Sequence, residues 1–104
     1  NVTNVAASAV AGTISYLRTM DVVNVFGIMT IDPTATGAIE VGISLPVASA
    51  FSAARQCGGT AACAAVSQFA AIDADTANAR ASLRGLATDT ANRTWSFNFS
   101  YRII

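Results

Sequence analysis

The chain is predicted to be all-β, an antiparallel two-sheet β-sandwich of jelly-roll-like type with about seven or eight strands. Three observations support this prediction. The closing segment TWSFNFSYRII alternates large apolar with polar side chains, the period of a half-buried strand. Residues 38–45 alternate in the same way. Turn-forming residues recur at close to the spacing of roughly 8 to 12 residues that sandwiches and barrels show.

The length indicates one domain. A chain of 104 residues can bury its own core but is too short for two, so we expect residues 1–104 to form a single β-sandwich domain. It opens at Asn1 without an initiator Met, which suggests the C-terminal part of a longer chain. Hydrophobic residues make up 53%, yet no apolar run approaches the roughly 18 to 20 residues of a transmembrane helix. We therefore expect no membrane insertion.

The first expected strands form a hairpin. Residues 13–19 and 22–31 carry many β-branched and aromatic side chains, and residues 19–21 between them are predicted to form a tight turn. A second turn is predicted at residues 32–37, where Pro33 fixes φ and Gly37 permits positive φ. One face of the second strand is expected to carry Val23, Val25, Gly27, Met29 and Ile31.

The middle of the chain is predicted to contain three further strands. Residues 38–45 alternate cleanly, and Pro46 ends this strand because it has no N–H to donate. Residues 47–59 are interpreted as a loop. Residues 60–67 and 68–73 are expected to be strands of mostly small side chains. The expected inward side chains of the first of the three strands are Ile39, Val41, Ile43 and Leu45.

Residues 75–87 admit two interpretations. A helix would begin at a cap on Asp75 or Thr76 and would carry an apolar stripe at helical spacing. The neighbouring elements are strands, however, and consecutive elements usually pair. We therefore favour a turn at residues 74–78 followed by a strand at residues 79–87.

A polar turn at residues 88–93 leads into the terminal strand. The apolar row of that strand is either buried core or an exposed platform on which sugars stack. Burying five such side chains at about 25 cal/mol per Å² would contribute on the order of 10 kcal/mol, comparable to the whole net stability of a small domain. We therefore favour the core. The row consists of Trp95, Phe97, Phe99, Tyr101 and Ile103.

The composition argues against an enzyme. The chain has no His and no Lys, which removes the usual general base, the Ser-His-Asp triad, Schiff-base catalysis and the commonest metal ligand. Asp73 and Asp75 lack the surroundings of an EF-hand, and an Asp-x-Asp step next to a turn is typical of a solvated loop. We predict no catalytic residue, no cofactor and no metal site.

The charge distribution argues against nucleic-acid binding. Six acidic and six basic residues cancel, and the basic residues, all Arg, are scattered instead of forming a stripe. Without net charge, little electrostatic repulsion separates two copies of the chain, so self-association is easier.

The two cysteines, Cys57 and Cys63, leave two alternatives open. Their spacing fits neither a redox CxxC pair nor a zinc knuckle. A disulfide closing this small loop would stabilise the fold by roughly 2 kcal/mol in the chain-entropy model, whereas free thiols would behave as small core residues. We hold the two alternatives equal.

Five segments together resemble a known module. They are SYLR at residues 15–18, VVNVFG at 22–27, IDPTA at 31–35, ISLP at 43–46 and FNFSYRI at 97–103. The chain resembles, over nearly its whole length, a β-sandwich module of bacteriophage virion structural proteins, of the kind found in tail fibres and related appendages. It departs from the pattern at Met20 and Asp21, where a tight turn favours Gly with Asn or Asp.

The resemblance implies a non-enzymatic virion structural domain of a tail fibre, appendage or capsid decoration, at the virion surface or on a tail appendage. Such a domain acts in particle assembly or host attachment, so its expected partners are other virion subunits and a host-surface glycan or protein. We expect a homo-oligomer and favour a trimer. Receptor contact is expected at exposed loops. The candidate loop contacts are Asp32, Thr34, Thr36, Arg55, Gln56, Asp89, Asn92 and Arg93.

The alternative function is a carbohydrate-binding module attached to a polysaccharide-acting enzyme. In that case Trp95 or Tyr101 would be exposed and would stack on sugar rings. Burial of these two side chains separates the alternatives.

Overall fold

The computed structural model describes residues 3–10, 12 and 14–104, and this part of the chain is all-β and antiparallel, as predicted. It contains eight strands and two single-turn 3₁₀ helices, with no α-helix in the described ranges. Residue 13, the expected start of the first strand, lies outside the described residues. The elements are β1 (Val5–Val10), β2 (Ser15–Thr19), β3 (Val22–Pro33), β4 (Gly37–Ile43), η1 (Ala54–Gln56), β5 (Cys57–Cys63), η2 (Ala64–Val66), β6 (Gln68–Asp75), β7 (Arg80–Ala87) and β8 (Arg93–Arg102).

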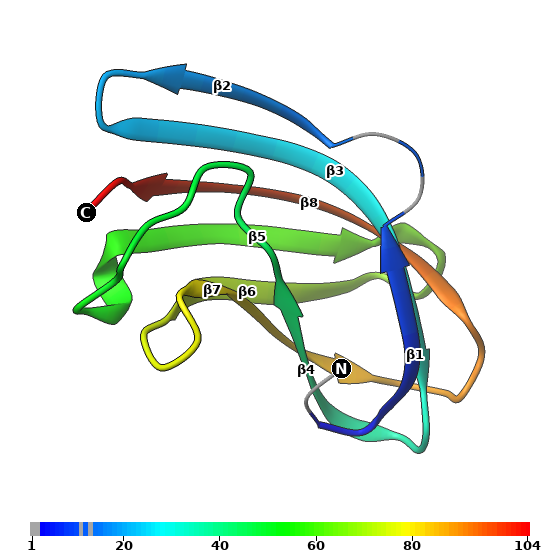
Figure 1. Cartoon of the computed structure of the whole chain (residues 1–104). Helices are drawn as coiled ribbons and strands as arrows, with labels where there is room; N and C mark the ends of the chain where they lie inside the picture. Colours follow the sequence, from blue (N-terminus) through cyan, green and yellow to red (C-terminus); the bar gives the residue numbers. More distant parts are fainter. Residues whose placement is uncertain (1–2, 11, 13) are drawn as a thin grey trace.

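The strands form one continuous sheet that curls into a nearly closed barrel (Figure 1). The strand order is β1-β3-β8-β5-β6-β7-β4. On the edge of β3 opposite β8, β2 pairs with residues 22–26 and β1 pairs with residues 29–33. Thr3 and Glu40 exchange two backbone hydrogen bonds of 3.1 Å, which join the N-terminal segment to β4. The ladders therefore run around the molecule without separating into two distinct sheets. Closure of this kind protects strand edges from unwanted pairing.

The aromatic row of β8 lies in the core. Trp95, Phe97, Phe99 and Tyr101 are each 2–3% exposed. The Phe97 and Phe99 rings stack with centroids 6.0 Å apart, and the Phe99 and Tyr101 centroids are also 6.0 Å apart. The interpretation of these four side chains as core is confirmed. The alternative, in which Trp95 or Tyr101 is exposed and stacks on sugar rings, was wrong. Ile103, beyond the end of the strand, is only partly buried.

The predicted hairpin of β2 and β3 is confirmed. Thr19 pairs with Val22 across a turn made by Met20 and Asp21. Met20 adopts φ +56°, in the left-handed region that favours Gly, at a cost of about 1–2 kcal/mol for a residue with a Cβ. The Arg18 Nε donates a hydrogen bond of 2.9 Å to the Met20 carbonyl oxygen, which helps to hold the turn.

Several strand limits differ from the sequence interpretation. The strand predicted at residues 60–67 ends at Cys63, after which η2 begins, and the strand predicted at residues 38–45 ends at Ile43. No strand was expected before Gly12, yet β1 pairs with the second half of β3. Residues 47–59 were interpreted as a loop, but β5 begins at Cys57, because Gly58 and Gly59 pair with β6 and β8. Small residues and glycines have weak intrinsic strand propensity, so a neighbouring strand decides whether they pair.

The strand alternative for residues 75–87 is confirmed. β7 pairs with β6 over residues 80–84 and with β4 over residues 81–87, and Leu83 is buried while Leu86 is exposed. A helical stripe would have placed both leucines on one face. The Asp75 carboxylate accepts hydrogen bonds from the backbone N–H groups of Ala77 and Asn78, and so organises the turn that precedes β7.

The connection between β4 and β5 is tied down onto one end of the barrel. The buried Tyr101 hydroxyl accepts a hydrogen bond of 3.0 Å from the Val47 N–H and donates one of 2.7 Å to the Val47 carbonyl oxygen. The Ser49 hydroxyl donates to the Arg102 carbonyl oxygen at 2.7 Å. Phe51 is buried edge-on against Tyr101, with centroids 5.9 Å apart. This segment therefore covers one end of the core and is not a freely exposed loop.

Both cysteines are free thiols, buried on the inward face of β5. Five residues lie between Cys57 and Cys63 in an extended strand, and six residue-to-residue steps span about 20 Å. A disulfide needs Cα atoms within about 7 Å, so a single straight strand cannot bridge its own two ends. The free-thiol alternative is the one the structure adopts.

The buried thiol leads to a prediction for alkaline solution. Burial raises the pKa of Cys57 from 9.0 to about 11, and the negative charge of Asp73 adds to the shift. The folded state holds this proton more tightly than the unfolded state, so the free energy of unfolding is expected to fall as the pH rises from 9.0 towards about 11. We expect a decrease on the order of 2 kcal/mol, measured by urea unfolding at several pH values.

The matched variant for this prediction is Cys57→Ala, which should lose less stability over the same alkaline range. A smaller decrease will remain, since burial also raises the pKa of Tyr101. The chain has no His, the side chain whose ordinary pKa lies nearest neutral pH, so both proteins should give a flat profile between about pH 6 and 8. Identical alkaline profiles for the two proteins would show that the Cys57 proton is not coupled to folding.

Candidate functional site

The predicted loop contacts lie at two opposite ends of the barrel. Ile31 pairs with Arg93 and Gly37 with Ala87, so the β3–β4 turn and the β7–β8 turn share one end. Cys57 pairs with Tyr101, which places η1 at the other end (Figure 1). The first end holds Thr34, Thr36, Asp89, Asn92 and Arg93, with Asp32 inside the end of β3, and the second holds Arg55 and Gln56. The eight residues therefore do not form one surface.

Several of these side chains already have partners within the chain. Arg93 forms an ion pair with Asp89, and its hydrogen bonds lower the pKa of that carboxyl. The side-chain amide oxygen of Gln56, Oε1, accepts hydrogen bonds from the backbone N–H groups of Ser52 and Ala53. These contacts shape turns, and they leave fewer groups available for a ligand.

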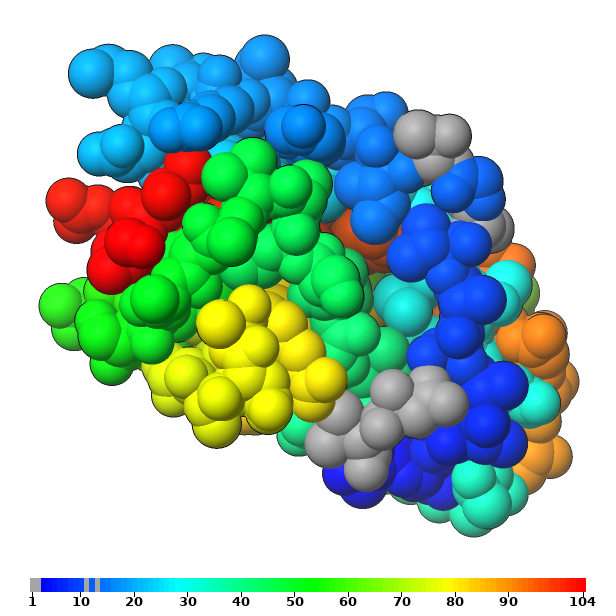
Figure 2. Space-filling model, in the orientation of Figure 1, coloured from blue at the N-terminus to red at the C-terminus, as the bar shows by residue number. Residues whose placement is uncertain are grey.

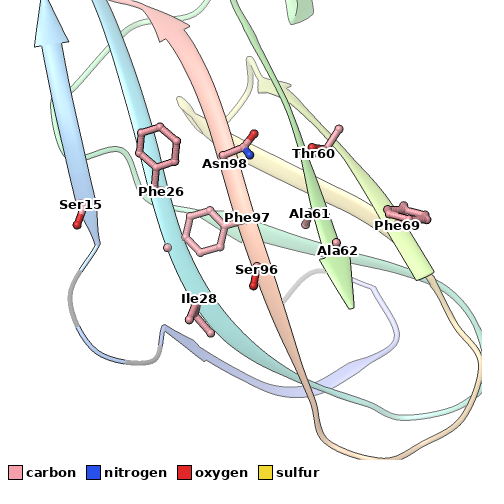
Figure 3. Close-up of a pocket in the computed structure, with 11 residues that line it drawn as sticks. Ser15, Phe26, Ile28, Thr60, Ala61, Ala62, Phe69, Ser96, Phe97 and Asn98 are labelled. Atoms are coloured by element: carbon pink, nitrogen blue, oxygen red, sulfur yellow. The ribbon is translucent and has the colours of Figure 1, made fainter. Parts of the chain in front are cut away.

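A groove on the outer face of the sheet is a stronger candidate. Its volume is about 590 Å³, and four neighbouring strands, β3, β8, β5 and β6, supply most of its lining (Figure 3). The lining residues are Ser15, Phe26, Gly27, Ile28, Thr60, Ala61, Ala62, Phe69, Ser96, Phe97 and Asn98.

The walls of the groove are apolar. Phe26 and Ile28 on β3 form one wall and are 54% and 45% exposed, and Phe69 on β6 forms the other and is 75% exposed. Three strand spacings separate β3 from β6, or about 14 Å. Large apolar side chains with this exposure are costly in water, so a cluster of them marks an interaction surface.

The floor of the groove is polar and uncharged. Thr60, Ser96 and Asn98 point outward from β5 and β8 between the walls (Figure 3). Within the described residues, no protein group forms a hydrogen bond with these three side chains. They therefore present hydroxyl and amide groups to water or to a ligand. No lining residue carries a charge.

The register explains why these residues meet. Ile28 pairs with Ser96, Ser96 with Ala62, and Ala62 with Phe69, so one row crosses the four strands. In a second row, Asn98 pairs with Phe26 on one side and with Thr60 on the other. Sequence reasoning missed this site. The available signal was that Phe26 and Phe69 are large aromatic side chains on the outward phase of their strands.

The groove lacks the parts of a catalytic centre. The nearest acidic side chains, Glu40 on β4 and Asp73 further along β6, each lie within 4 Å of Arg84, and neither lines the groove. Among the described residues, no group of three His, Cys, Asp or Glu side chains could hold a metal ion. The arrangement can bind an uncharged ligand by apolar contact and neutral hydrogen bonds.

These features define a small antiparallel β-barrel domain with an uncharged groove on the outer face of its sheet. Comparisons of the chain with protein-family models, curated proteins and solved structures find no match. In the described part of the chain, no helix has the length and hydrophobicity needed to cross a membrane.

Proposed function

We propose that the chain is a non-enzymatic structural domain of a bacteriophage virion, carried on a tail fibre, another appendage or the capsid surface, and that it attaches the particle to a host-surface glycan. The resemblance of SYLR, IDPTA and FNFSYRI to virion modules supports the virion location. We also propose that the fold is a jelly-roll-like sandwich, in which opposite walls of the curled sheet are the two layers. Other virion subunits, including further copies of this chain, are the structural partners.

The uncharged groove is the observation that carries the attachment role. Sugar rings present C–H groups that pack on aromatic faces, and their hydroxyls pair with amide and hydroxyl groups. The groove offers both kinds of contact, through Phe26 and Phe69 on its walls and Asn98 on its floor. Its lack of charge favours a neutral ligand over a sialylated or sulfated one. A span of about 14 Å suits a short oligosaccharide better than a single sugar.

The second candidate function is a carbohydrate-binding module of a polysaccharide-acting enzyme. The same groove favours this function, because Phe26 and Phe69 offer the exposed aromatic rings for sugar stacking that were expected at Trp95 and Tyr101. The assembly state separates the two candidates, because a virion domain works as part of an oligomer whereas a detached module works as a monomer. Light scattering of the purified chain measures this difference.

The groove is tested by titrating short neutral oligosaccharides of hexoses and N-acetylhexosamines into the isotope-labelled protein and following its NMR spectrum. We expect saturable shifts of the Asn98 side-chain amide. Phe69→Ala and Asn98→Ala should each weaken binding about tenfold, which corresponds to roughly 1.4 kcal/mol. The control Thr94→Ala, on the outer face of the same strand but outside the groove, should bind as the unmodified protein does. Absence of saturable shifts, or a preference for anionic sugars, would refute this role.

A further inference from the structure

Strand β2 is the most exposed strand of the described chain. All five of its residues are exposed, including Tyr16 at 53% and Leu17 at 64%. Within the described residues it pairs only with β3, so its second edge has no partner strand. The hairpin of β2 and β3 stands at the margin of the molecule in the orientation shared by Figures 1 and 2. An open edge with apolar side chains is a template for pairing with another strand.

The direction of the backbone groups along β2 follows from the register. The Asp21 carbonyl oxygen accepts a hydrogen bond of 2.7 Å from the Ile103 N–H, on the β8 side of β3. Backbone groups alternate along a strand, so Val22 faces β2 and forms a hydrogen-bonded pair with Thr19. Ser15 and Leu17 then also bond to β3. The N–H and C=O groups of Tyr16 and Arg18 therefore point to the open edge.

We propose that β2 pairs with β2 of a second copy of this chain, antiparallel and centred on Leu17. This register aligns all five residues of both strands and places Tyr16 opposite Arg18 of the second copy, where each can exchange both backbone hydrogen bonds. A shift by one pair towards the turn would place the two Arg18 side chains opposite each other, and like charges directly opposite are destabilising. The centred register avoids this repulsion.

Side-chain chemistry supports the same register. Arg18 uses Nε to hold the Met20 carbonyl oxygen, which leaves the rest of its guanidinium able to lie over the Tyr16 ring of the partner copy. The two Leu17 side chains meet on the other face, at the twofold axis. Zero net charge leaves little long-range repulsion between the copies.

The pairing yields a twofold dimer in which two barrels share a sheet, in place of the trimer favoured from sequence. An interface centred on five residues is small, so we expect an equilibrium between monomer and dimer that depends on concentration. This inference rests on the proposed function, in which copies of the chain associate, and it specifies the surface through which they do so. Saccharide binding in the groove is measured separately, so either proposal can fail alone.

A cysteine placed on the axis tests the register. Residues 17 of the two copies form a non-hydrogen-bonded pair with Cα atoms about 4.5 Å apart, within the range of a disulfide. Leu17→Cys should form a disulfide-linked dimer rapidly under mild oxidation, and the buried Cys57 and Cys63 should not compete. The control Thr94→Cys, exposed on a central strand, should cross-link much more slowly. Equal cross-linking rates would overturn the register.

Proline on the open edge tests the backbone pairing. Arg18→Pro removes an N–H that the fold does not use, so the barrel should stay folded, as judged by its far-ultraviolet circular dichroism. We expect sedimentation analysis to give a dissociation constant at least about tenfold higher for Arg18→Pro than for Arg18→Ala, which keeps the N–H. A monomer at every concentration, or a trimer that Arg18→Pro does not weaken, would refute the proposal.

Discussion

Replacing Phe99 with alanine is expected to lower the free energy of unfolding by about 3–5 kcal/mol. Phe99 is 2% exposed and lies at the centre of the β8 row, stacked on the ring of Phe97 and tilted against the ring of Tyr101. Truncation would leave a cavity between elements that are held in a nearly closed barrel, so the walls can collapse only partly. Urea unfolding followed by the fluorescence of the single Trp95 measures the loss.

The matched control is Phe69→Ala, because the same side chain is removed from the outer face. Phe69 is 75% exposed, so its loss should change the free energy of unfolding by no more than about 0.5 kcal/mol. A larger effect at Phe69 than at Phe99 would mean that the inner and outer faces of the sheet have been exchanged.

Replacing Gly59 with alanine is expected to destabilise the fold by about 3 kcal/mol or more. A Cβ at this position would lie 2.2 Å from the Asn98 carbonyl oxygen and 2.6 Å from the Phe99 Cα. Both atoms belong to the backbone of the paired strand β8, which cannot turn aside as a flexible side chain can. The clash would force β5 and β8 apart at the centre of the sheet.

The adjacent Gly58 provides the control. A Cβ there meets nothing within 4 Å, so Gly58→Ala should stay within about 0.5 kcal/mol of the unmodified protein. Thermal unfolding of the two variants side by side makes the comparison. Equal losses at Gly58 and Gly59 would contradict the close approach of β5 to β8.

Local alternation predicted the faces of the strongest strands correctly. Phe97 and Phe99 point inward with Val41 and Ile43, as their period of two indicates, and the hairpin turn lies at Met20 as expected. These features depend on residues close together in the chain. The weak strand β1 and the start of β5 were missed, since short or small side chains carry little signal until a partner strand is known.

The candidate site was beyond the reach of the same reasoning. Phe26 and Phe69 lie far apart in the chain and become the two walls of one groove only because β8 and β5 pair between them. Loop position suggested contacts such as Thr34 and Arg55, which the strand directions place at opposite ends of the barrel. Proximity along the chain could not reveal either outcome.

The amino-acid sequence alone was sufficient for the all-β class, the inward rows and the exclusion of the usual His- and Lys-dependent chemistry, because each follows from residue type or from a period of two along one strand. Strand order, closure through Thr3 and Glu40, the groove and the open edge of β2 required the tertiary structure. Their physical cause is hydrogen bonding between distant segments, and many pairings of the same strands would satisfy the same local pattern.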